Sequence, residues 1–299
     1  MNRRRHRYRW REIGASAGFL LPALAVFGVF TFYPLVRSVW LSFHANDLLG
    51  RPVRFVGLDQ YTKFFEEPEL RRVLLTTALF AILTVLPTLL IGLFLALVLQ
   101  TRVRGIGVFR TVMATPFAFS AASAAVVFDA FYSPSVGVFN GILHNLGIPQ
   151  VDWLTSPSVA LPSLALVIIW RDIGYAMLVC SAGLQSIPDQ LFEAARIDGA
   201  GYLTLLRKII LPLLTPTMFF LLVVGTIGSL QTFGEINILT GGGPDGATTT
   251  LVYNLYQSAF AFGVSDYGLA SAQAVILLFL VMGVTAVQFT VLQRKVFYS

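Results

Sequence analysis

Residues 193–199 read Glu193-Ala194-Ala195-Arg196-Ile197-Asp198-Gly199, and after nine further residues the chain continues as Ile209-Ile210-Leu211-Pro212. This polar, helix-forming segment lies between two long apolar runs. Positions 193–208 hold one Glu, one Asp, two Arg and one Lys, and charged side chains are costly inside a bilayer. We therefore expect the segment to lie in water, at the surface of a protein that is otherwise embedded in a membrane.

The composition also indicates an integral membrane protein. Apolar residues make up 56% of the 299 positions and charged residues 12%, and the mean hydropathy is +0.75. A soluble domain carries about 25% charged residues. The net charge of +6 does not indicate nucleic-acid binding, because the basic residues gather at the ends of apolar runs. The single cysteine, Cys180, excludes an internal disulfide, and we expect it to be a small buried apolar residue.

Six apolar runs are long enough to cross a bilayer, for which a helix needs about 20 residues. They lie at 15–39, 73–99, 108–131, 159–183, 211–234 and 268–292. We expect one all-α, six-span membrane domain over 15–292, with a basic cytoplasmic N-terminus at 1–14 and a cytoplasmic C-terminus at 293–299. A basic start before an apolar run is also typical of a signal peptide, but this run is too long and five more follow it.

The orientation follows from the basic residues, which concentrate on the cytoplasmic side of membrane proteins. With the N-terminus inside, fourteen of the 21 Lys and Arg residues are cytoplasmic. The external loops at 132–158 and 235–265 then contain no Lys or Arg. This orientation places both termini and the polar loop at 185–212 in the cytoplasm.

The polar loop is predicted to contain two short helical segments. Pro188 suits the first position of a helix over 188–198, because its missing N–H costs nothing there. The apolar stripe of this helix consists of Leu191, Phe192 and Ala195, with Ala194 beside it. Gly199 suits the left-handed residue that ends a helix. A second segment at 202–210 is followed by Pro212, which we expect to kink the chain into the fifth span.

The spacing of an EAA triplet, three residues, Gly, nine residues and I-x-L-P resembles the signature loop of the permease subunits of ABC importers. The resemblance implies a type I permease fold in which loop 185–212 docks onto a separate ATPase as a coupling helix. It assigns this coupling role to Glu193, Ala194, Ala195, Asp198, Gly199, Ile209, Leu211 and Pro212. Glu193 and Asp198 would make polar contacts at the rim of the ATPase socket or hold the loop itself. The alternative interpretation is an amphipathic interfacial helix without a partner.

Other stretches resemble the carbohydrate-type members of this family. They are Phe55-Val56-Gly57-Leu58-Asp59-Gln60-Tyr61, Ile187-Pro188 and Thr240-Gly241-Gly242-Gly243-Pro244. The C-terminal third is most similar to the A-type permease subunits of glycerol-3-phosphate (glycerophosphodiester) importers, at Leu211-Pro212, 219–224, 247–251 and Val287-Gln288-Phe289. This resemblance implies sn-glycerol-3-phosphate or a glycerophosphodiester as the solute, with a mono- or oligosaccharide as the alternative.

The resemblance also implies partners and a location. The partners are a second homologous permease, two copies of an ABC ATPase, an extracytoplasmic solute-binding protein and the lipid bilayer of a bacterial cytoplasmic (inner) membrane. ATP and Mg would bind to the ATPase subunits. From other classes, an ATPase-independent secondary transporter would give no reason for the EAA loop, and a membrane-embedded enzyme would need a catalytic constellation.

No catalytic residue, cofactor or metal site is predicted in the chain itself. Gly241-Gly242-Gly243-Pro244 lacks the Lys-Ser/Thr that a nucleotide-binding loop requires. Gly14-Ala15-Ser16-Ala17-Gly18 spells the G-x-S-x-G hydrolase pattern, but it opens an apolar span rather than a strand-to-helix turn. The three histidines, at positions 6, 44 and 144, are too far apart for a metal-ligand spacing.

Polar groups in or near spans are candidates for the substrate pathway: Arg171, Tyr175, Asp129, Gln231 and Glu235. Arg171, near the centre of the fourth span, either attracts an anionic phosphate or pairs with Asp129 or another helix. Tyr175, one turn away, shares its face, whereas the neighbouring Asp172 is expected to point elsewhere. Gln231 and Glu235 are four residues apart, so we expect them to share a face and either to touch substrate or to meet headgroups and water.

Overall fold

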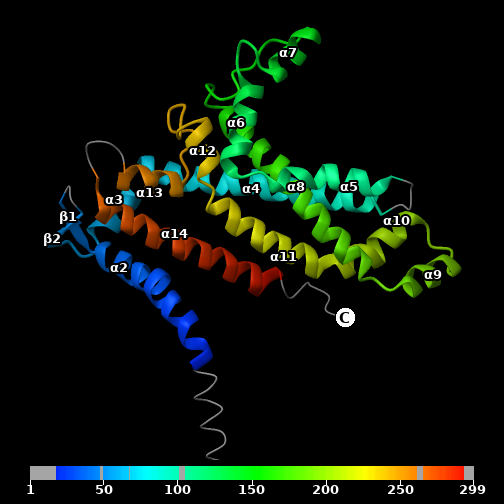
Figure 1. Cartoon of the computed structure of the whole chain (residues 1–299), viewed down its shortest axis with the longest axis horizontal. Helices are drawn as coiled ribbons and strands as arrows, with labels where there is room; N and C mark the ends of the chain where they lie inside the picture. The colour runs from blue at the N-terminus through cyan, green and yellow to red at the C-terminus, as the bar shows by residue number, and fades with distance from the viewer. Residues whose placement is uncertain (1–17, 48–49, 67, 101–104, 261–264, 293–299) are drawn as a thin grey trace, which may run out of the picture. The chain divides into compact units, whose positions relative to one another are not determined.

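The computed structural model describes residues 18–47, 50–66, 68–100, 105–260 and 265–292. The chain divides into two compact units, one of residues 1–64 with 255–276 and one of residues 65–254 with 277–299. The regular structure of the described residues is helical apart from one two-stranded sheet (Figure 1). The expected all-α class is therefore confirmed.

The smaller unit combines the first apolar helix with a β-hairpin. Its elements are a helical run over Gly18–Leu41, which contains the π-helical turn Gly28–Phe32 and α2 (Tyr33–Leu41), then β1 (His44–Asn46), β2 (Pro52–Phe55) and the start of α3 (Asp59–Glu66). The strands pair antiparallel with His44 opposite Phe55. Gln60 of α3 donates from Nε2 to the carbonyl of His44 at 3.0 Å, which fastens the hairpin to the helix.

The larger unit holds most of the remaining helices. Its first half consists of α4 (Pro68–Val98), α5 (Ile106–Ala114), the 3₁₀ turn Thr115–Ala118, α6 (Ala121–Tyr132), α7 (Val138–Asn145) and α8 (Ala160–Gln185). Its second half consists of α9 (Asp189–Ile197), α10 (Tyr202–Leu205), the π-helical turn Leu206–Ile210, α11 (Leu211–Leu230) and α12 (Gly234–Leu239). Two further helices run across the division between the units: α13 (Leu251–Phe260) and α14 (Tyr267–Val287), which continues into the π-helical turn Gln288–Leu292.

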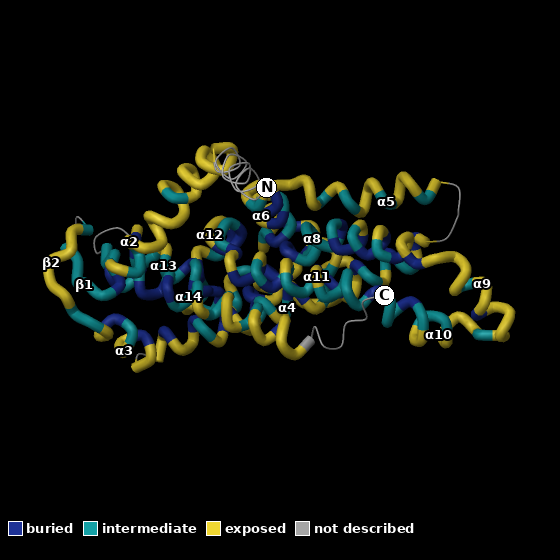
Figure 2. Tube along the Cα trace, turned by 90° about the horizontal axis from the view of Figure 1, so that it is seen from below, coloured by how far each residue is buried: buried dark blue, intermediate teal, exposed yellow. Residues whose placement is uncertain are grey.

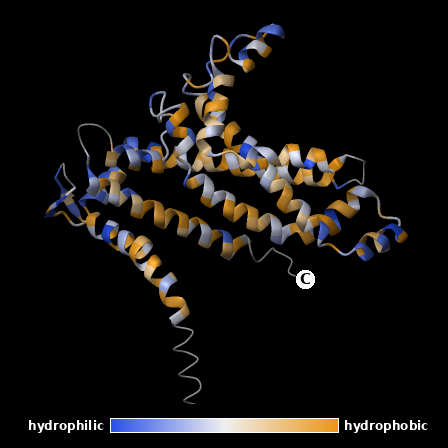
Figure 3. Ribbon diagram, viewed as in Figure 1, coloured by the Kyte–Doolittle hydropathy of each residue, from blue (hydrophilic) through white to orange (hydrophobic). Residues whose placement is uncertain are grey.

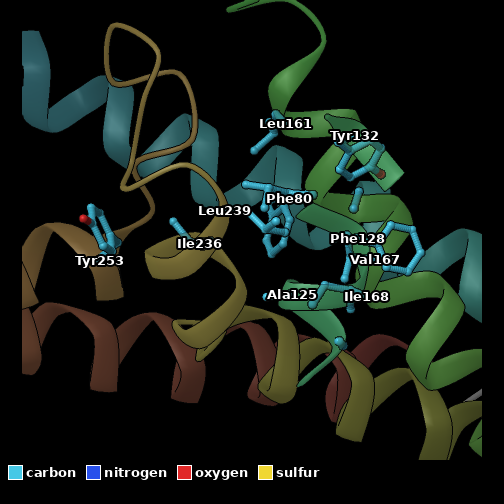
Figure 4. Close-up of a cluster of buried hydrophobic side chains, with 13 residues drawn as sticks. Phe80, Ala125, Phe128, Tyr132, Leu161, Val167, Ile168, Ile236, Leu239 and Tyr253 are labelled. Atoms are coloured by element: carbon cyan, nitrogen blue, oxygen red, sulfur yellow. The ribbon is translucent and has the colours of Figure 1, made fainter. Parts of the chain in front are cut away.

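The core of the larger unit lies where α4, α8 and α11 pack on one another. Glycine is required at Gly92 because a Cβ there would overlap Ala176 of α8. One cluster of buried side chains joins α4, α6, α8 and α12 (Figure 4), and Tyr132 within it donates to the carbonyl of Ser163 at 2.8 Å. A second cluster contains Cys180, which is fully buried as expected.

Several polar side chains inside this unit bond to each other, while many apolar side chains lie on its surface. Thr84 of α4 and Ser229 of α11 are hydrogen-bonded through their hydroxyls at 2.8 Å, and Gln288 donates to the Thr226 hydroxyl at 2.9 Å. The long helices are rich in apolar residues (Figure 3), and many of these residues are exposed in the isolated chain (Figure 2). This arrangement suits a chain surrounded by lipid and partner subunits rather than by water.

Five described helical runs are long and apolar enough to cross a membrane, and one bent pair of helices is a sixth candidate. The five runs are Gly18–Leu41, Pro68–Val98, Ala160–Gln185, Tyr202–Leu239 and Tyr267–Val291, each at one of the expected positions. Positions 1–14 and 293–299, together with the first three residues of the expected first span, lie outside the described residues.

The third expected span, 108–131, is not one continuous helix, so that prediction was wrong. Ile106–Ala118 and Ala121–Tyr132 meet at an angle of 102°. Pro116 lies in the 3₁₀ turn that ends the first half, where its missing N–H does not have to join a helical ladder. Ser120 then caps α6, accepting from the N–H of Ser123 at 3.1 Å, which starts a new helix in a new direction.

Candidate functional site

The polar loop at 185–212 begins with α9, a helix with a defined start and stop. Pro188 is extended (φ −61°, ψ 133°) and forms the N-cap of α9, so the helix begins at Asp189, one residue later than the start predicted at Pro188. Gly199 has φ +73°. The N–H of Gly199 bonds to the carbonyl of Arg196 at 3.1 Å, and the N–H of Ala200 bonds to that of Ala195 at 2.9 Å. This pair of bonds is the Schellman motif, so the predicted stop at Gly199 is confirmed.

The helix α9 presents only part of the EAA triplet on its surface. Glu193 and Ala194 are exposed, as is Asp198 just after the helix. Ala195 is buried, with 8% of its surface exposed, and Phe192 packs against a buried cluster, whereas Leu191, the remaining residue of the predicted stripe, is 40% exposed. Glu193 and Ala194 are therefore available to a partner, whereas Ala195 holds α9 in place.

Three exposed apolar side chains extend the free surface of this loop. They are Ile197 (85% exposed), Tyr202 (66%) and Leu203 (57%). None of them is among the predicted coupling residues. The signal in the sequence is that Ile197 falls outside the apolar stripe of α9, so its side chain has no place in the chain's own core.

Behind α9 lies a cavity of about 1520 Å³ between the ends of α4, α5, α8 and α10. Phe192, Glu193 and Arg196 of α9 line it on one side, and Leu184 of α8 on another. Arg110 of α5 also lines the cavity and donates from Nη2 to the carbonyl of Leu99 at 2.7 Å. Part of α9 therefore packs against the rest of the chain, and part of it borders this cavity.

A continuous helical segment connects this loop to the core. From α10 the chain passes through the π-helical turn into α11 without a break over Tyr202–Leu230. Pro212 lies at the start of α11, directly after the π turn, where the wider turn accommodates its missing N–H. Ile210 is buried, while Ile209, Leu211 and Pro212 are half-buried. The coupling residues predicted at 209–212 thus lie in a joint between the loop and the fifth span.

The bend between α5 and α6 brings aromatic rings against α8. Phe117 stacks on Tyr175 with ring centroids 4.9 Å apart, and Phe119 contacts Trp170 at 5.8 Å. Ser120 and Ser123, on the first turn of α6, are exposed and hydrogen-bonded through their hydroxyls at 2.9 Å. Tyr175 is therefore part of an aromatic pair beside a break in the helix, a relationship that span prediction by hydropathy does not reveal.

Three charged side chains meet at the centre of α8. Arg171 donates from Nε to Asp172 Oδ1 at 2.8 Å and from Nη2 to Oδ2 at 3.3 Å. It also donates from Nη1 to Glu235 of α12. The side chains of Arg171, Asp172 and Glu235 are 20%, 33% and 2% exposed. The expectation that Asp172 points away from Arg171 was wrong, because the long arginine side chain reaches across the angle between adjacent residues.

The other predicted pathway residues do not join this cluster. Asp129 is exposed on α6 and is not the partner of Arg171, which pairs with another helix instead. Gln231 is exposed whereas Glu235 is buried, so their expected common face was wrong. The reason is that α11 ends at Leu230 and α12 starts only at Gly234, and helical spacing does not apply across that break.

The turn into α12 is what places the Glu235 carboxylate inside the chain. α12 packs against α6 and α8, and a Cβ at Gly234 would lie 3.0 Å from the Ala121 side chain, so this packing is close. Within the described part of the chain, no group of three His, Cys, Asp or Glu side chains is placed to hold a metal ion.

Comparisons with known proteins extend this description. Residues 68–298 match the family described as binding-protein-dependent transport system inner membrane component. The sn-glycerol-3-phosphate transport system permease protein UgpA of Yersinia enterocolitica is 37% identical over 283 residues, covering 94% of each chain. The sulfoquinovosyl glycerol transport system permease protein SmoG of Agrobacterium fabrum is 35% identical, covering 96% of this chain and 94% of its own. The trehalose/maltose transport system permease protein MalF of Thermococcus litoralis is also 35% identical, covering 93% and 94%.

Solved structures show the same fold. A chain of a bacterial alginate ABC transporter, in complex with an alginate pentasaccharide-bound periplasmic protein, superposes with a TM-score of 0.83 at 23% identity, covering 95% of this chain and 97% of its own. A chain of a bacterial ABC transporter involved in alginate import gives 0.80 at 25% identity, covering 95% and 99%. The fold is thus that of a type I ABC importer permease. The chain belongs to the family of inner membrane components of binding-protein-dependent transport systems, as a non-catalytic, multi-pass permease subunit of an ABC importer of the sugar or glycerol-phosphate type.

Proposed function

We propose that this permease forms half of a translocation pathway and couples it to separate ATPase subunits through loop 185–212. A second, homologous permease forms the other half, and two ATPase copies lie on the cytoplasmic side together with both chain termini. The observation that carries this proposal is the construction of the loop. Its helix α9 has exposed residues for a partner, and Tyr202–Leu230 is one helical segment from the loop into the core.

The mechanism is alternating access, in which the ATPase dimer moves α9 and α9 moves the spans. Glu193 and Ala194 contact the ATPase, and Gly199 fixes the angle at which α9 leaves the membrane. Displacement of the loop passes through the joint at Ile209, Leu211 and Pro212 into α11. The ATPase subunits hold ATP and Mg, and only a higher affinity of ATP for their closed state can drive the shift.

We place the pathway beside the bend in the third span. A break in a helix at membrane depth is tolerated where it is buried in protein or lines a water-filled cavity, but not where it faces lipid. Ser120 and Ser123 at this break are exposed, as is Asp129 further along α6. Tyr175, stacked on Phe117, would offer ring faces to a solute passing these polar groups.

Two solute classes follow from the relatives. The UgpA relative is named for sn-glycerol-3-phosphate, which supports this compound or a glycerophosphodiester as the first candidate. A mono- or oligosaccharide is the second candidate. The trehalose/maltose relative supports it, and so does the engagement of all three Arg171 nitrogens by carboxylates. An extracytoplasmic binding protein would deliver the solute, as the periplasmic protein bound to the alginate transporter illustrates.

The coupling role is tested by reversing the charge at Glu193. We expect Glu193→Lys to reduce both copurification of the ATPase and solute uptake, because this exposed side chain contacts the partner. The matched control is Glu69→Lys, which makes the same change at an exposed position in the first turn of α4. Unchanged ATPase association and uptake in Glu193→Lys would falsify the coupling role.

The same preparation separates this proposal from an ATPase-independent secondary transporter. Vesicles that contain the two permeases but no ATPase should show no concentrative uptake. Uptake at the full rate without the ATPase would establish the secondary transporter instead. Loss of uptake in both Glu193→Lys and Glu69→Lys would show a general effect of charge reversal and would also contradict the specific role of α9.

A further inference from the structure

The geometry points to a charge filter: Arg171, Asp172 and Glu235 form a cluster of net negative charge that favours uncharged polyhydroxy solutes over phosphate esters or sulfonates. This inference rests on the proposed function, and of the two solute candidates named there it selects the mono- or oligosaccharide over the glycerol phosphate. Asp172 is the specificity-determining residue, while Arg171 and Glu235 position its carboxylate.

The charge of the cluster follows from its members. One guanidinium and two carboxylates together carry a net charge of −1. Within the described residues, Arg171 is the cation that forms ion pairs with both carboxylates. Three of its five N–H groups, one on each nitrogen, donate to carboxylate oxygens, so an incoming anion would reach only the two remaining N–H groups and would meet two carboxylates beside them. Arg171 is therefore not a free anion site.

The three side chains differ in how far they are exposed. Glu235 is almost fully buried, with 2% of its side chain exposed, whereas 33% of the Asp172 side chain is exposed. Glu235 holds Arg171 from the side of α12, and Arg171 holds both oxygens of Asp172. Asp172 is thus the member of the cluster whose charge is accessible to a passing solute.

The surroundings of Asp172 are aqueous rather than lipid. A carboxylate in a span faces the interior of a helix bundle or a water-filled cavity, because the cost of exposing it to hydrocarbon is high. Tyr175, three residues after Asp172 and therefore on the same side of α8, stacks on Phe117 at the bend of the third span. The cluster therefore borders the same break in the helix at which the pathway is placed.

The chemistry of a fixed carboxylate determines which solutes it admits. Its oxygens accept hydrogen bonds from hydroxyl groups and accept none from an ionised phosphate or sulfonate, which has only acceptor oxygens. Like charges a few ångströms apart also repel, the more so where water is partly excluded. A polyol or saccharide is thus accommodated at Asp172, whereas a phosphate ester is repelled.

The local charge can be measured without knowing the solute. The single cysteine, Cys180, is buried and is replaced by alanine. Tyr175→Cys then places a thiol three residues from Asp172, on the same face of α8. In native membrane vesicles, where the chain is assembled with its partners, we would compare modification rates for a trimethylammonium and a sulfonate methanethiosulfonate reagent.

We expect the cationic reagent to react faster, relative to the same pair of rates for a free thiol in solution. Asp172→Asn should lower the ratio of cationic to anionic rates by about tenfold, as removal of one nearby unit charge requires. Glu235→Gln should lower the ratio in the same direction. The matched control is Asp152→Asn, an equal charge change at an exposed position in the loop after α7, which should leave the ratio unchanged.

A second reporter, Phe117→Cys, keeps the test valid if Tyr175→Cys does not assemble, because these two rings stack on each other. Equal ratios in Asp172→Asn and Asp152→Asn would overturn the filter, as would a faster anionic reagent in the parent chain. A cation supplied by the second permease would abolish the cationic preference and so count against it. Absence of reaction at both reporters would also overturn it, since the site would not be aqueous. None of these outcomes depends on ATPase association, so the charge filter and the coupling role fail independently.

Discussion

The buried carboxylate of Glu235 accepts a hydrogen bond from the guanidinium of Arg171, which lies 64 positions earlier in the chain. This ion pair joins α12, at the end of the fifth span-length run Tyr202–Leu239, to the centre of α8. Because Arg171 also binds Asp172, the two ends of the network are not equivalent. Removing the shared cation leaves two carboxylates unpaired, whereas removing Glu235 leaves an intact pair.

The first prediction uses this asymmetry. Arg171→Gln should destabilise the permease by about 3–5 kcal/mol, the usual cost of removing one partner from a buried ion pair. Glu235→Gln should cost about 1–3 kcal/mol, since Arg171 keeps Asp172 as its counterion. Both losses of stability are measured by heating the purified transporter and recording the decrease of its monodisperse peak in size-exclusion chromatography. Equal losses would show that the pair with Asp172 does not compensate for Arg171.

The second prediction concerns the crossing of α4 and α8. Gly92→Ala should destabilise the chain by about 1–3 kcal/mol, because a Cβ there overlaps Ala176 and overpacking forces the helices apart. The matched control is Gly283→Ala in α14, where a Cβ meets nothing within 4 Å. The two variants are compared by their unfolding temperatures. A loss at Gly283 as large as that at Gly92 would contradict the close packing.

The third prediction concerns the stop of α9. Gly199→Ala should strain the left-handed residue by about 1–2 kcal/mol and lower the solute-stimulated ATP hydrolysis of the assembled importer, because α9 then leaves its angle. Gly201→Ala is the matched control, since Gly201 has an ordinary φ of −71° and open space around it. An equal effect of both substitutions on ATP hydrolysis would indicate that conformation at Gly199 does not matter.

The fourth prediction concerns the aromatic pair at the bend. Tyr175→Ala should raise the KM for uptake by the assembled importer, because it removes a ring face from the pathway, whereas Tyr175→Phe should keep the stacking on Phe117. A ring pair contributes about 0.5–1.5 kcal/mol beyond its buried area. Phe219→Ala breaks another ring pair, with Phe289 at 5.1 Å, and should leave the KM unchanged. An unchanged KM in Tyr175→Ala would remove this pair from the pathway.

Much of the fold follows from hydropathy alone, because a bilayer imposes length and apolarity on every span. The expected span at 211–234 lies within Tyr202–Leu239, and the one at 159–183 coincides with Ala160–Gln185 except for its first residue. Hydropathy averaged over a window carries no information on the direction of a helix axis, so it did not predict the 102° bend. Pro116 followed by a serine N-cap at Ser120 was the available signal, and it specifies a new helix rather than a tolerated proline.

The helix in the loop at 185–212 was predictable to within one residue at its start because its structure is local. Pro188 and Gly199 act on their own backbone, and the apolar stripe of α9 follows helical spacing. The charged cluster was not predictable, because its geometry depends on where α12 lies. Helical spacing placed Gln231 beside Glu235, but the break after Leu230 separates them, and only the tertiary packing of α12 on α6 and α8 brings Glu235 to Arg171.

The separation of the third span into two helices has a mechanical consequence. Each half retains its own hydrogen-bonded ladder, so the angle between them can change through the torsions of Phe119 and Ser120 without unwinding either half. α6 has 12 residues, which makes it about 18 Å long at 1.5 Å per residue, so a swing of about 10° carries its far end roughly 3 Å. A displacement of that size is the width of a water molecule, and a hinge of two residues is enough to produce it.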